Sequence, residues 1–352
     1  PTEILANQIY SNVLNHLDNE EVKPILLTGS SKNKSEIYEK IEKGIFNFII
    51  GTHAIFQENL NFSSLAYVII DEQHRFGVQQ RLYLAEKGVN TNILLMSATP
   101  IPRTLALAQY GEIEQVILKE KPAFQKPIIT KVSNIDKIKD IEILLKKKIS
   151  NVSQVYWICP LVEASETQKY KDVETRFKSL KNIFGSEVEM LHGKIKSDQK
   201  ERIIQNFQKG NIKILVATTV VEVGIDNKNA DYIVIENAEK FGLSQLHQLR
   251  GRVGRGNNQG YCFALYGKDL PDNTINRLKI FKENLDGFKL SEKDLEIRGT
   301  GDILGYRQSG DSLFKFVNVY HDQELIIDAL QYVKKLIEKK EYENEKFKKD
   351  IY

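Results

Sequence analysis

Residues 66–74 read Ala-Tyr-Val-Ile-Ile-Asp-Glu-Gln-His, and this stretch decides the fold. Its continuous apolar run, bounded by polar residues, is typical of a strand that is buried on both faces of a parallel sheet. Asp71 and Glu72 follow at the carboxyl end of that strand, where open α/β sheets place their ligand sites. One carboxylate can hold the Mg²⁺ of a nucleotide, and the next can polarise an attacking water. An Asp-Glu pair by itself usually just ends a strand in solvent, so its assignment to a nucleotide site depends on other motifs in the sequence.

A second charged cluster lies far downstream, where residues 248–255 read Gln-Leu-Arg-Gly-Arg-Val-Gly-Arg. Arginine offers a planar fork of donors, and this spacing suits a clamp on a triphosphate. We therefore predict that Gln248, Arg252 and Arg255 contact the nucleotide. The alternative is a set of surface charges, but glycines on both sides favour close packing on a ligand. The two clusters, in this order, indicate a nucleic-acid motor ATPase.

Composition narrows the class of protein without identifying it. The 352 residues are enough for two domains or more, and a net charge of +3 means that any nucleic-acid surface must be local. Cys159 and Cys262 lack Cys-x-x-Cys spacing, so we expect neither a disulfide framework nor a zinc site. No apolar run reaches membrane-span length and no signal peptide is visible, so we expect a soluble cytoplasmic protein with no membrane partner.

An internal repeat predicts the architecture. An apolar strand reaches a glycine turn at residues 26–29 and again at 190–193. Charged amphipathic helices follow at 34–42 and 200–208, and both end at a Lys-Gly pair whose glycine acts as the left-handed stop. The helices lead into strands at 46–50 and 213–216.

The agreement between the copies continues along the chain. The next strand ends in Asp71-Glu72 in one copy and in Glu236-Asn237 in the other, and the offset stays between 164 and 166 residues throughout. Such ordered agreement indicates two copies of one βαβ-rich fold. Only the first copy keeps Asp-Glu, so only that lobe can supply the metal carboxylates.

The predicted fold class is α/β: two tandem parallel-sheet lobes followed by a helical region. We place the lobes at 1–120 and 128–268, because prolines flank a polar stretch between them. The remainder, 269–352, contains helical patterns at 274–286 and 323–340 around a glycine-rich turn. Tyr156 and Trp157 follow an apolar stretch and are expected in the core.

These residues resemble the motor portion of the RecG family of superfamily 2 DNA translocases nearly from end to end. The resemblance implies that both lobes are RecA-like and that a helical hairpin and a translocation-coupling segment follow them. The Asp-Glu-Gln-His at 71–74 has the spelling of motif II in that family. Motifs II, III and VI are specific as a set, whereas Ia and Ib alone would be weak. The other matching segments are 1–6 (motif Ia), 51–53 (Ib), 97–104 (III), 216–226 (V), 248–255 (VI) and 295–310 (the segment that couples ATP turnover to translocation).

The resemblance implies ATP and Mg²⁺ as cofactors, with Asp71 on the metal and Glu72 activating water. It also implies roles for residues in three groups. His74 would sense the γ-phosphate and Asp226 would contact the ribose. Thr2, Thr52, Thr218 and Thr219 would contact DNA phosphates. The residues that couple hydrolysis to movement would be Ser97, Thr99, Arg277, Arg298 and Gln308.

Several of these residues also fit structural roles. Thr218 and Thr219 fit a helix cap as well as a DNA contact, although the matching Thr52 in the first copy favours DNA. Ser97 and Thr99 are similarly cap-like. Arg298 fits a cap on a neighbouring helix. His74 fits a packed histidine.

Family resemblance implies branched DNA, such as forks and four-way junctions, as the partner of a monomer, with single-stranded DNA-binding protein as a further partner. Two other readings compete with this one. The transcription-repair coupling translocase shares the motor, but its motif II usually reads Asp-Glu-Glu-Gln, so His74 disfavours it. A non-catalytic nucleic-acid-binding remnant is disfavoured because Glu72, Arg252 and Arg255 are intact.

One departure from the family pattern concerns the phosphate cradle. The sequence contains no Gly-x-x-x-x-Gly-Lys-Ser/Thr, and it starts at Pro1. In the family this loop lies shortly upstream of motif Ia, and the wedge domain lies further upstream. We therefore expect a truncated fragment that does not hydrolyse ATP by itself.

Overall fold

The structure is a computed structural model. The described residues are 1–17, 21–73, 76, 80, 83–84, 86–98, 114, 116–118, 120, 125–149, 153–160, 171–218, 227–298 and 322–338. They fall into two compact units. One unit comprises Pro1–Ala98, Phe124–Phe241 and Gln248–Thr274, and the other comprises Thr99–Ala123, Gly242–His247 and Ile275–Tyr352.

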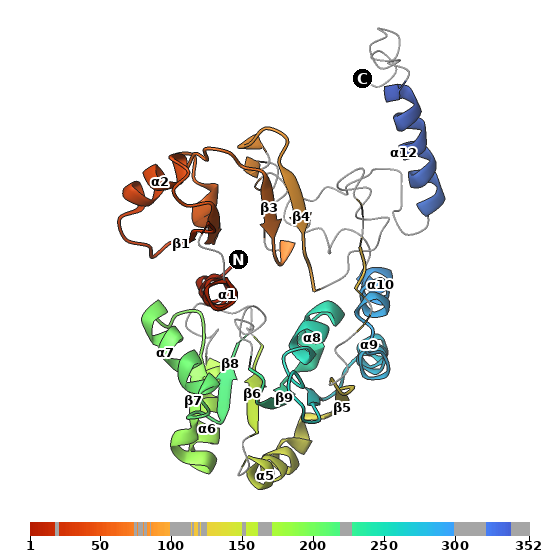
Figure 1. Cartoon of the computed structure of the whole chain (residues 1–352). Helices are drawn as coiled ribbons and strands as arrows, with labels where there is room; N and C mark the ends of the chain where they lie inside the picture. The colour runs from red at the N-terminus through yellow and green to blue at the C-terminus, as the bar shows by residue number, and fades with distance from the viewer. Residues whose placement is uncertain are drawn as a thin grey trace. The chain divides into compact units, whose positions relative to one another are not determined.

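The first lobe contains two pairs of parallel strands (Figure 1). Leu27, Ile41 and Leu60 are buried in one small core, and Val68, Ile70 and Phe76 are buried in another. Its elements are α1 (Glu3–His16), β1 (Pro24–Leu27), α2 (Lys34–Glu42), β2 (Phe48–Gly51), the 3-10 helix η1 (His53–Phe56), β3 (Tyr67–Ile70) and β4 (Asn92–Leu95). β1 pairs with β2, and β3 pairs with β4.

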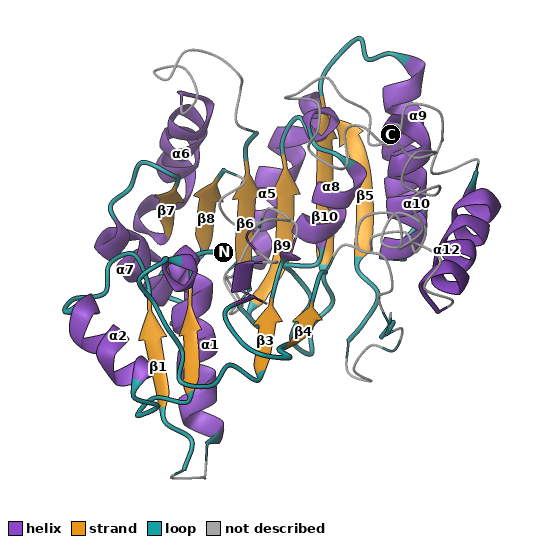
Figure 2. Ribbon diagram, turned by 90° about the horizontal axis from the view of Figure 1, so that it is seen from above, coloured by secondary structure: helices purple, strands orange, loops and turns teal. Residues whose placement is uncertain are grey.

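The second lobe is built on a six-stranded parallel sheet in the order β5-β10-β9-β6-β8-β7, seen side by side in Figure 2. Its strands are β5 (Ile129–Asn134), β6 (Gln154–Ile158), β7 (Val188–Leu191), β8 (Ile214–Ala217), β9 (Ala230–Ile235) and β10 (Tyr261–Tyr266). The helices are α5 (Ile138–Lys148), α6 (Lys171–Phe184), α7 (Ser197–Gln208) and α8 (Leu243–Arg250), with short 3-10 turns η3 (Ile135–Lys137), η4 (Gly185–Glu187) and η6 (Ala238–Lys240).

Alternation along the central strand β6 directs its side chains to two faces. Trp157 packs in the core formed with α5 and α6. Tyr156 points the other way, and its ring lies 5.0 Å from the ring of Phe207 on α7. Both β6 residues are fully buried, as predicted. The sheet is therefore covered on both faces, as a parallel sheet requires.

The predicted repeat is confirmed at the level of single hydrogen bonds. Thr52 N donates to Leu27 O at 3.2 Å, and Thr218 N donates to Leu191 O at 3.4 Å. α2 and α7 both end at the predicted glycine stops, with φ of 71° at Gly44 and 83° at Gly210. A left-handed backbone at these positions favours glycine, because other residues are strained there.

Two predictions about these elements need correction. β3 is not buried on both faces: Val68 and Ile70 are buried, whereas Tyr67 and Ile69 are each 55% exposed. No described element covers that second face, so the apolar run alternates in burial. α7 begins at Ser197, three residues before the start that its charge pattern predicted.

In the described part of the chain, three helices follow the second lobe. They are α9 (Asp272–Glu283), α10 (Gly287–Arg298) and α12 (Gln323–Glu338). α9 and α10 form the predicted hairpin region, and α12 matches the predicted helix at 323–340 up to residue 338. The boundaries at 120, 128 and 268 remain predictions.

Candidate active site

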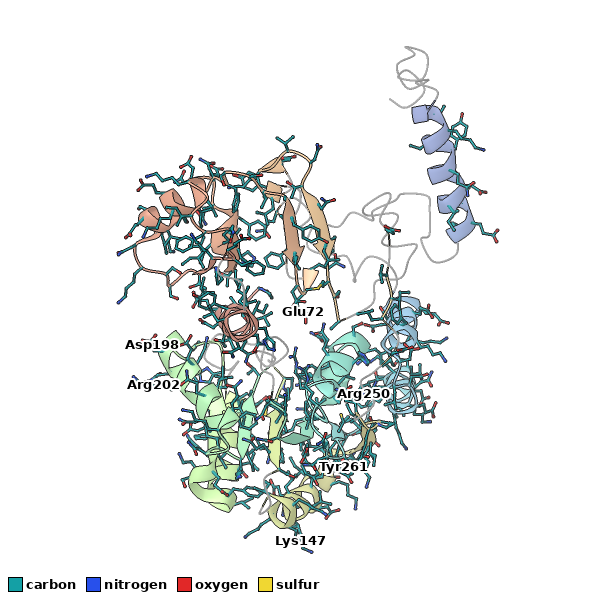
Figure 3. All side chains as sticks on the ribbon, in the orientation of Figure 1. Glu72, Lys147, Asp198, Arg202, Arg250 and Tyr261 are labelled. Atoms are coloured by element: carbon teal, nitrogen blue, oxygen red, sulfur yellow. The ribbon has the colours of Figure 1, made fainter. Side chains whose placement is uncertain are left out.

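The Asp-Glu pair lies in a strained turn at the carboxyl end of β3. Asp71 Oδ1 accepts a hydrogen bond from the backbone N–H of Glu72 at 2.8 Å. Glu72 has φ of 51°, a left-handed conformation that costs a non-glycine residue about 1 kcal/mol or more. Its side chain is buried, with 7% of the residue exposed. Figure 3 labels Glu72 at this strand end. Strain held at such a position is characteristic of functional sites.

The backbone of β4 holds this turn in place. Met96 N donates to Ile70 O at 2.8 Å, and Gln73 N donates to Met96 O at 3.1 Å. These two bonds join the end of β3 to the end of β4, where Ser97 follows. The predicted hydrolytic and coupling motifs are therefore neighbours through the backbone of Met96.

The carboxylates fit a nucleotide-bound Mg²⁺ and not an all-protein metal cage. Among the described residues, no group of three or more His, Cys, Asp and Glu side chains could hold a metal ion. Mg²⁺ bound with nucleotides usually takes one or two carboxylates and completes its shell with phosphate oxygens and water. Asp71 Oδ1 accepts one backbone hydrogen bond, which helps to fix the carboxylate and leaves lone pairs for such an ion.

The predicted DNA-contacting threonines have different environments. Thr2 is half-buried and caps α1, its Oγ1 accepting from Leu5 N at 3.3 Å. Thr52 is buried with 8% exposed. Thr218 is fully buried, and its Oγ1 has no hydrogen-bond partner in the described part of the chain. The hydroxyl of Thr218 would need a local rearrangement to reach a phosphate.

The second lobe presents the predicted arginine clamp after α8. Arg252 is buried with 8% exposed, whereas Arg255 is half-buried and donates from Nε to Gly251 O at 3.0 Å. Gln248 is half-buried on the last turn of the helix. Arg252 and Arg255 are thus held differently although their sequence settings are alike.

The glycines of this segment pack on the protein's own backbone. Gly254, at φ of 69°, donates its N–H to Ala230 O at 3.1 Å and lies against Gly260. A Cβ on Gly256 would lie 2.5 Å from Lys228 O. The prediction that such glycines make room for a ligand therefore needs correction at Gly254 and Gly256, because their space is filled by the chain itself.

Arg250 is a structural residue that the sequence did not distinguish. It is among the largest fully buried side chains, and burial lowers the pKa of its guanidinium. The thiol of Cys262 on β10 lies close enough to interact with that charge. Figure 3 labels Arg250 on α8.

Asp294 on α10 was also missed. It is 4% exposed and caps α8, accepting from Leu243 N at 3.3 Å, from Ser244 N at 3.4 Å and from Ser244 Oγ at 3.1 Å. A carboxylate at a helix N-terminus satisfies otherwise unpaired N–H groups and interacts favourably with the helix dipole. This cap fixes α10 to the first turn of α8.

The structure describes some of the remaining predicted residues. Ser97 and Arg277 are half-buried, and Arg298 is the last residue of α10. Five predicted residues lie outside the described residues: His74, Thr99, Thr219, Asp226 and Gln308.

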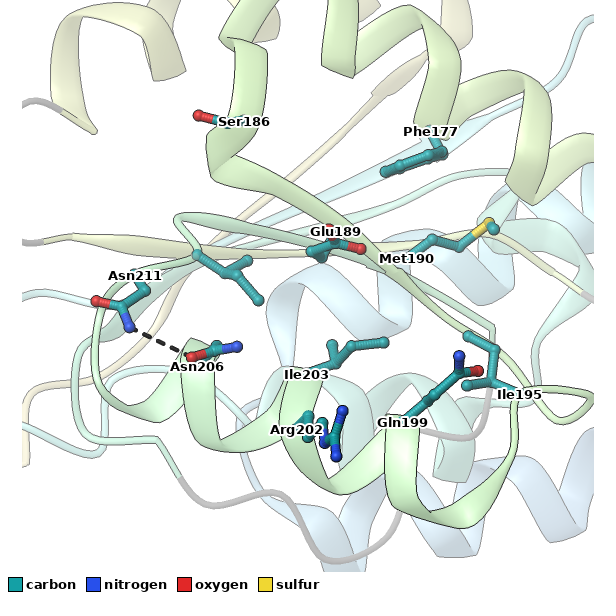
Figure 4. A pocket seen from close by; sticks show the side chains of 11 residues that line it. Phe177, Ser186, Glu189, Met190, Ile195, Gln199, Arg202, Ile203, Asn206 and Asn211 are labelled. Atoms are coloured by element: carbon teal, nitrogen blue, oxygen red, sulfur yellow. Dashed lines mark hydrogen bonds between the residues drawn. The ribbon is translucent and has the colours of Figure 1, made fainter.

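A groove of about 560 Å³ lies beside the edge strand β7 and contains none of the predicted site residues (Figure 4). Phe177, Met190 and Ile203 supply apolar lining. Asn211 Nδ2 donates to Asn206 Oδ1 at 3.3 Å on its wall. Gln199 and Arg202 add polar groups.

Residues 1–108 match a family described as DEAD/DEAH box helicase, and residues 135–257 match the helicase conserved C-terminal domain. These two matches cover the lobes that carry the Asp-Glu turn and the arginine clamp.

Similar proteins and structures extend the match. The chain is 47% identical over 333 residues to the ATP-dependent DNA helicase RecG of Borreliella burgdorferi. The aligned region covers 93% of this chain and 48% of that protein. The corresponding protein of Streptococcus pneumoniae is 44% identical over 94% of this chain and 49% of its own length. The chain spans about half the length of these relatives.

A solved structure of RecG bound to a three-way DNA junction has a TM-score of 0.71 and 38% identity, covering 93% of this chain and 42% of that one. The S. cerevisiae Dbp5 structure with RNA and ADP BeF3, at 18% identity and a TM-score of 0.61, covers 86% of this chain and 80% of its own, and it shares the fold. With two RecA-like lobes, the motif II turn and these relatives in place, the chain belongs to the RecG type of superfamily 2 helicase motors.

Proposed function

We propose that this chain is the ATP-driven motor of an enzyme that moves along and remodels branched DNA. The observation that carries the proposal is the turn at the carboxyl end of a parallel strand, where half-buried Asp71 precedes Glu72, which is buried and strained. The relatives' names support ATP use and DNA as the substrate class, and the junction-bound RecG structure supports branched DNA.

Each residue of the site has one task in this proposal. When bound, ATP with Mg²⁺ supplies the phosphoanhydride bond whose cleavage drives the motor. Asp71 would hold the Mg²⁺, and Glu72 would accept the proton of the attacking water. Arg252 and Arg255 place positive charge where negative charge develops during hydrolysis.

DNA contacts complete the proposal. Thr2 and Thr52 in the first lobe and Thr218 in the second hold the phosphate backbone, so binding is insensitive to sequence. Because the contacts lie on both lobes, a change in lobe separation would step the strand. We further propose a monomer, with single-stranded DNA-binding protein as a partner.

The decisive experiment restores the phosphate cradle. We define the restored enzyme as this chain joined at Pro1 to the segment that precedes the matching region in the Borreliella burgdorferi relative. The restored enzyme should hydrolyse ATP when forked DNA is added, and Glu72→Gln should abolish the activity. Glu58→Gln serves as a matched control, because that carboxylate is exposed and belongs to none of the predicted motifs.

The chain without that segment should show negligible ATPase activity, because the sequence contains no P-loop to hold the β- and γ-phosphates. Robust turnover by the chain alone, lost in Glu72→Gln, would contradict the need for an upstream cradle. A restored enzyme whose rate is unaffected by Glu72→Gln would overturn the assignment of the site.

A further inference from the structure

An aromatic cluster in the first lobe joins the Thr52 turn to the Asp-Glu turn. The ring of His53 stacks on the ring of Phe76, with centroids 4.8 Å apart and planes at 27°. Phe56 contacts both, at 5.9 Å from His53 and 5.4 Å from Phe76. His53 and Phe56 bound the 3-10 helix η1, whereas Phe76 follows β3.

Each end of this cluster is fixed to a site residue by the backbone. His53 directly follows Thr52, whose carbonyl accepts from Ile55 N at 3.1 Å and so closes the η1 turn. Phe76 N donates to Gln73 O at 3.1 Å, and Gln73 follows Glu72. A movement of Thr52 therefore reaches the Glu72 turn through two short turns and one ring stack.

The two rings of the stack differ in burial. Phe76 is 9% exposed and packs with Val68 and Ile70, the strand residues directly beneath Asp71. His53 is exposed, so its outer side is open to solvent or to a ligand beside Thr52. An aromatic pair at this separation prefers a stacked or tilted geometry, and displacing one ring disturbs the other.

Gly51 limits how the Thr52 turn can move. A Cβ at Gly51 would lie 2.1 Å from Leu27 O, so the backbone there is in close contact with β1. Thr52 N is also bonded to Leu27 O. Because the N-terminal side of the turn is held against β1, a displacement of the turn moves His53.

We propose that His53 is a positioning residue that transmits DNA binding at Thr52 to the hydrolytic turn at Glu72 through its stack on Phe76. The inference rests on the proposed function and adds a route by which DNA stimulates hydrolysis. His53 touches neither the reacting atoms nor the metal in this role. It sets the position of the turn that carries Glu72.

The first test measures ATPase activity of the restored enzyme with and without forked DNA, together with DNA affinity. His53→Ala should lower the DNA-stimulated rate about three- to tenfold, the effect expected from one aromatic pair. DNA affinity should change less than about twofold. His53→Phe keeps a ring on Phe76 and should retain the stimulation.

Two controls separate the stack from other roles. His16→Ala removes an exposed histidine whose Nδ1 lies 2.8 Å from Asn12 O within α1, and it should leave the stimulation unchanged. Phe76→Leu keeps an apolar side chain but removes the ring, so it should resemble His53→Ala while remaining folded. Circular dichroism of each variant checks the fold.

Three results would overturn the proposal. Normal stimulation in His53→Ala would show that the stack transmits nothing. Equal loss in His53→Ala and His53→Phe would assign the effect to the imidazole itself. A parallel loss of DNA affinity and stimulation would make His53 a DNA contact.

A second measurement does not depend on hydrolysis. In this chain with ¹³C-labelled histidine, the imidazole resonance that disappears in His53→Ala should carry a ring-current shift that Phe76→Leu removes. Forked DNA should move that resonance in the wild-type chain, and it should move it less in Phe76→Leu. A resonance unaffected by DNA would overturn the route even if the restored enzyme hydrolyses ATP. An inactive restored enzyme with a DNA-responsive resonance would instead contradict the proposed function.

Discussion

The indole N–H of Trp157 donates to Oε1 of Glu236 at 2.5 Å, beneath the carboxyl end of the second-lobe sheet. Glu236 also pairs with Arg176, whose Nη2 lies 3.3 Å from Oε2, and Arg176 lies over the Trp157 ring at 5.5 Å. In the internal repeat, Glu236 occupies the place of Asp71. The first copy keeps a carboxylate with an oxygen available for metal, whereas the second uses its carboxylate to hold β6, β9 and α6 together.

Replacement of Glu236 should therefore destabilise the second lobe without touching nucleotide chemistry. Glu236→Gln removes the nearer of the two carboxylates that pair with half-buried Arg176 and leaves Glu142 at 3.4 Å, so we expect a loss of about 2 kcal/mol in the free energy of unfolding. Urea denaturation measures it. Lys178→Ala, on the exposed side of the same helix, should change stability by less than about 0.5 kcal/mol. A Glu236→Gln variant as stable as the parent chain would show that the cluster is not a stabilising one.

Arg255 should affect hydrolysis far more than DNA binding. In the restored enzyme, Arg255→Ala should lower kcat about 10³-fold, because a cation facing the transferring phosphate contributes that much in related motors. DNA affinity, measured by fluorescence anisotropy, should be largely retained. Loss of DNA binding with normal hydrolysis would assign Arg255 to the nucleic acid.

Coupling of hydrolysis to movement is expected to depend on Arg298 and Gln308. Arg298→Ala or Gln308→Ala in the restored enzyme should keep most DNA-stimulated ATPase activity yet lose fork unwinding. The physical reason is that a glycine-rich segment between them, at 299–305, can be repositioned by a small helix shift. Both activities should be measured on one preparation: parallel loss would indicate misfolding, and normal unwinding would remove the coupling role.

Acid should weaken the fold through two histidines. Burial lowers the pKa of His53 and of His192 from the ordinary value of 6.5. The unfolded chain therefore binds these protons more readily than the folded chain does. The contribution of the two neutral histidines to the free energy of unfolding is complete above pH 6.5 and is lost as the pH falls below that value. Urea midpoints between about pH 7.5 and pH 5.5 should show this fall. A variant with His53→Phe and His192→Gln should show a shallower dependence, and an unchanged dependence would contradict the prediction.

The two thiols should be inert in the folded chain. Burial raises the pKa of Cys262 to about 12, with a smaller opposing effect of Arg250, and burial raises the pKa of Cys159 well above its ordinary value. Because the thiolate is the reactive form, iodoacetamide at about pH 8 should label neither cysteine in the native chain and both after denaturation. Mass spectrometry gives the count, and rapid labelling of either thiol in the native chain would contradict its burial.

Local sequence pattern determined the repeat and the position of the site. Helix stops at Gly44 and Gly210, the strand before Asp71 and the turn at Thr52 follow from periodicity and from the backbone preferences of glycine, which act over a few residues. Two copies of that pattern were enough to predict two parallel-sheet lobes.

Tertiary structure alone decided which members of a motif are buried within the protein and which stay partly exposed. Arg250, Arg252 and Arg255 look alike in sequence, but Arg250 is fully buried near Cys262, and Arg255 remains partly exposed. The same holds for Asp294, which caps a helix 50 residues earlier in the chain. Burial, capping and the stack of His53 on Phe76 depend on contacts between residues distant in sequence, and neither periodicity nor composition encodes such contacts.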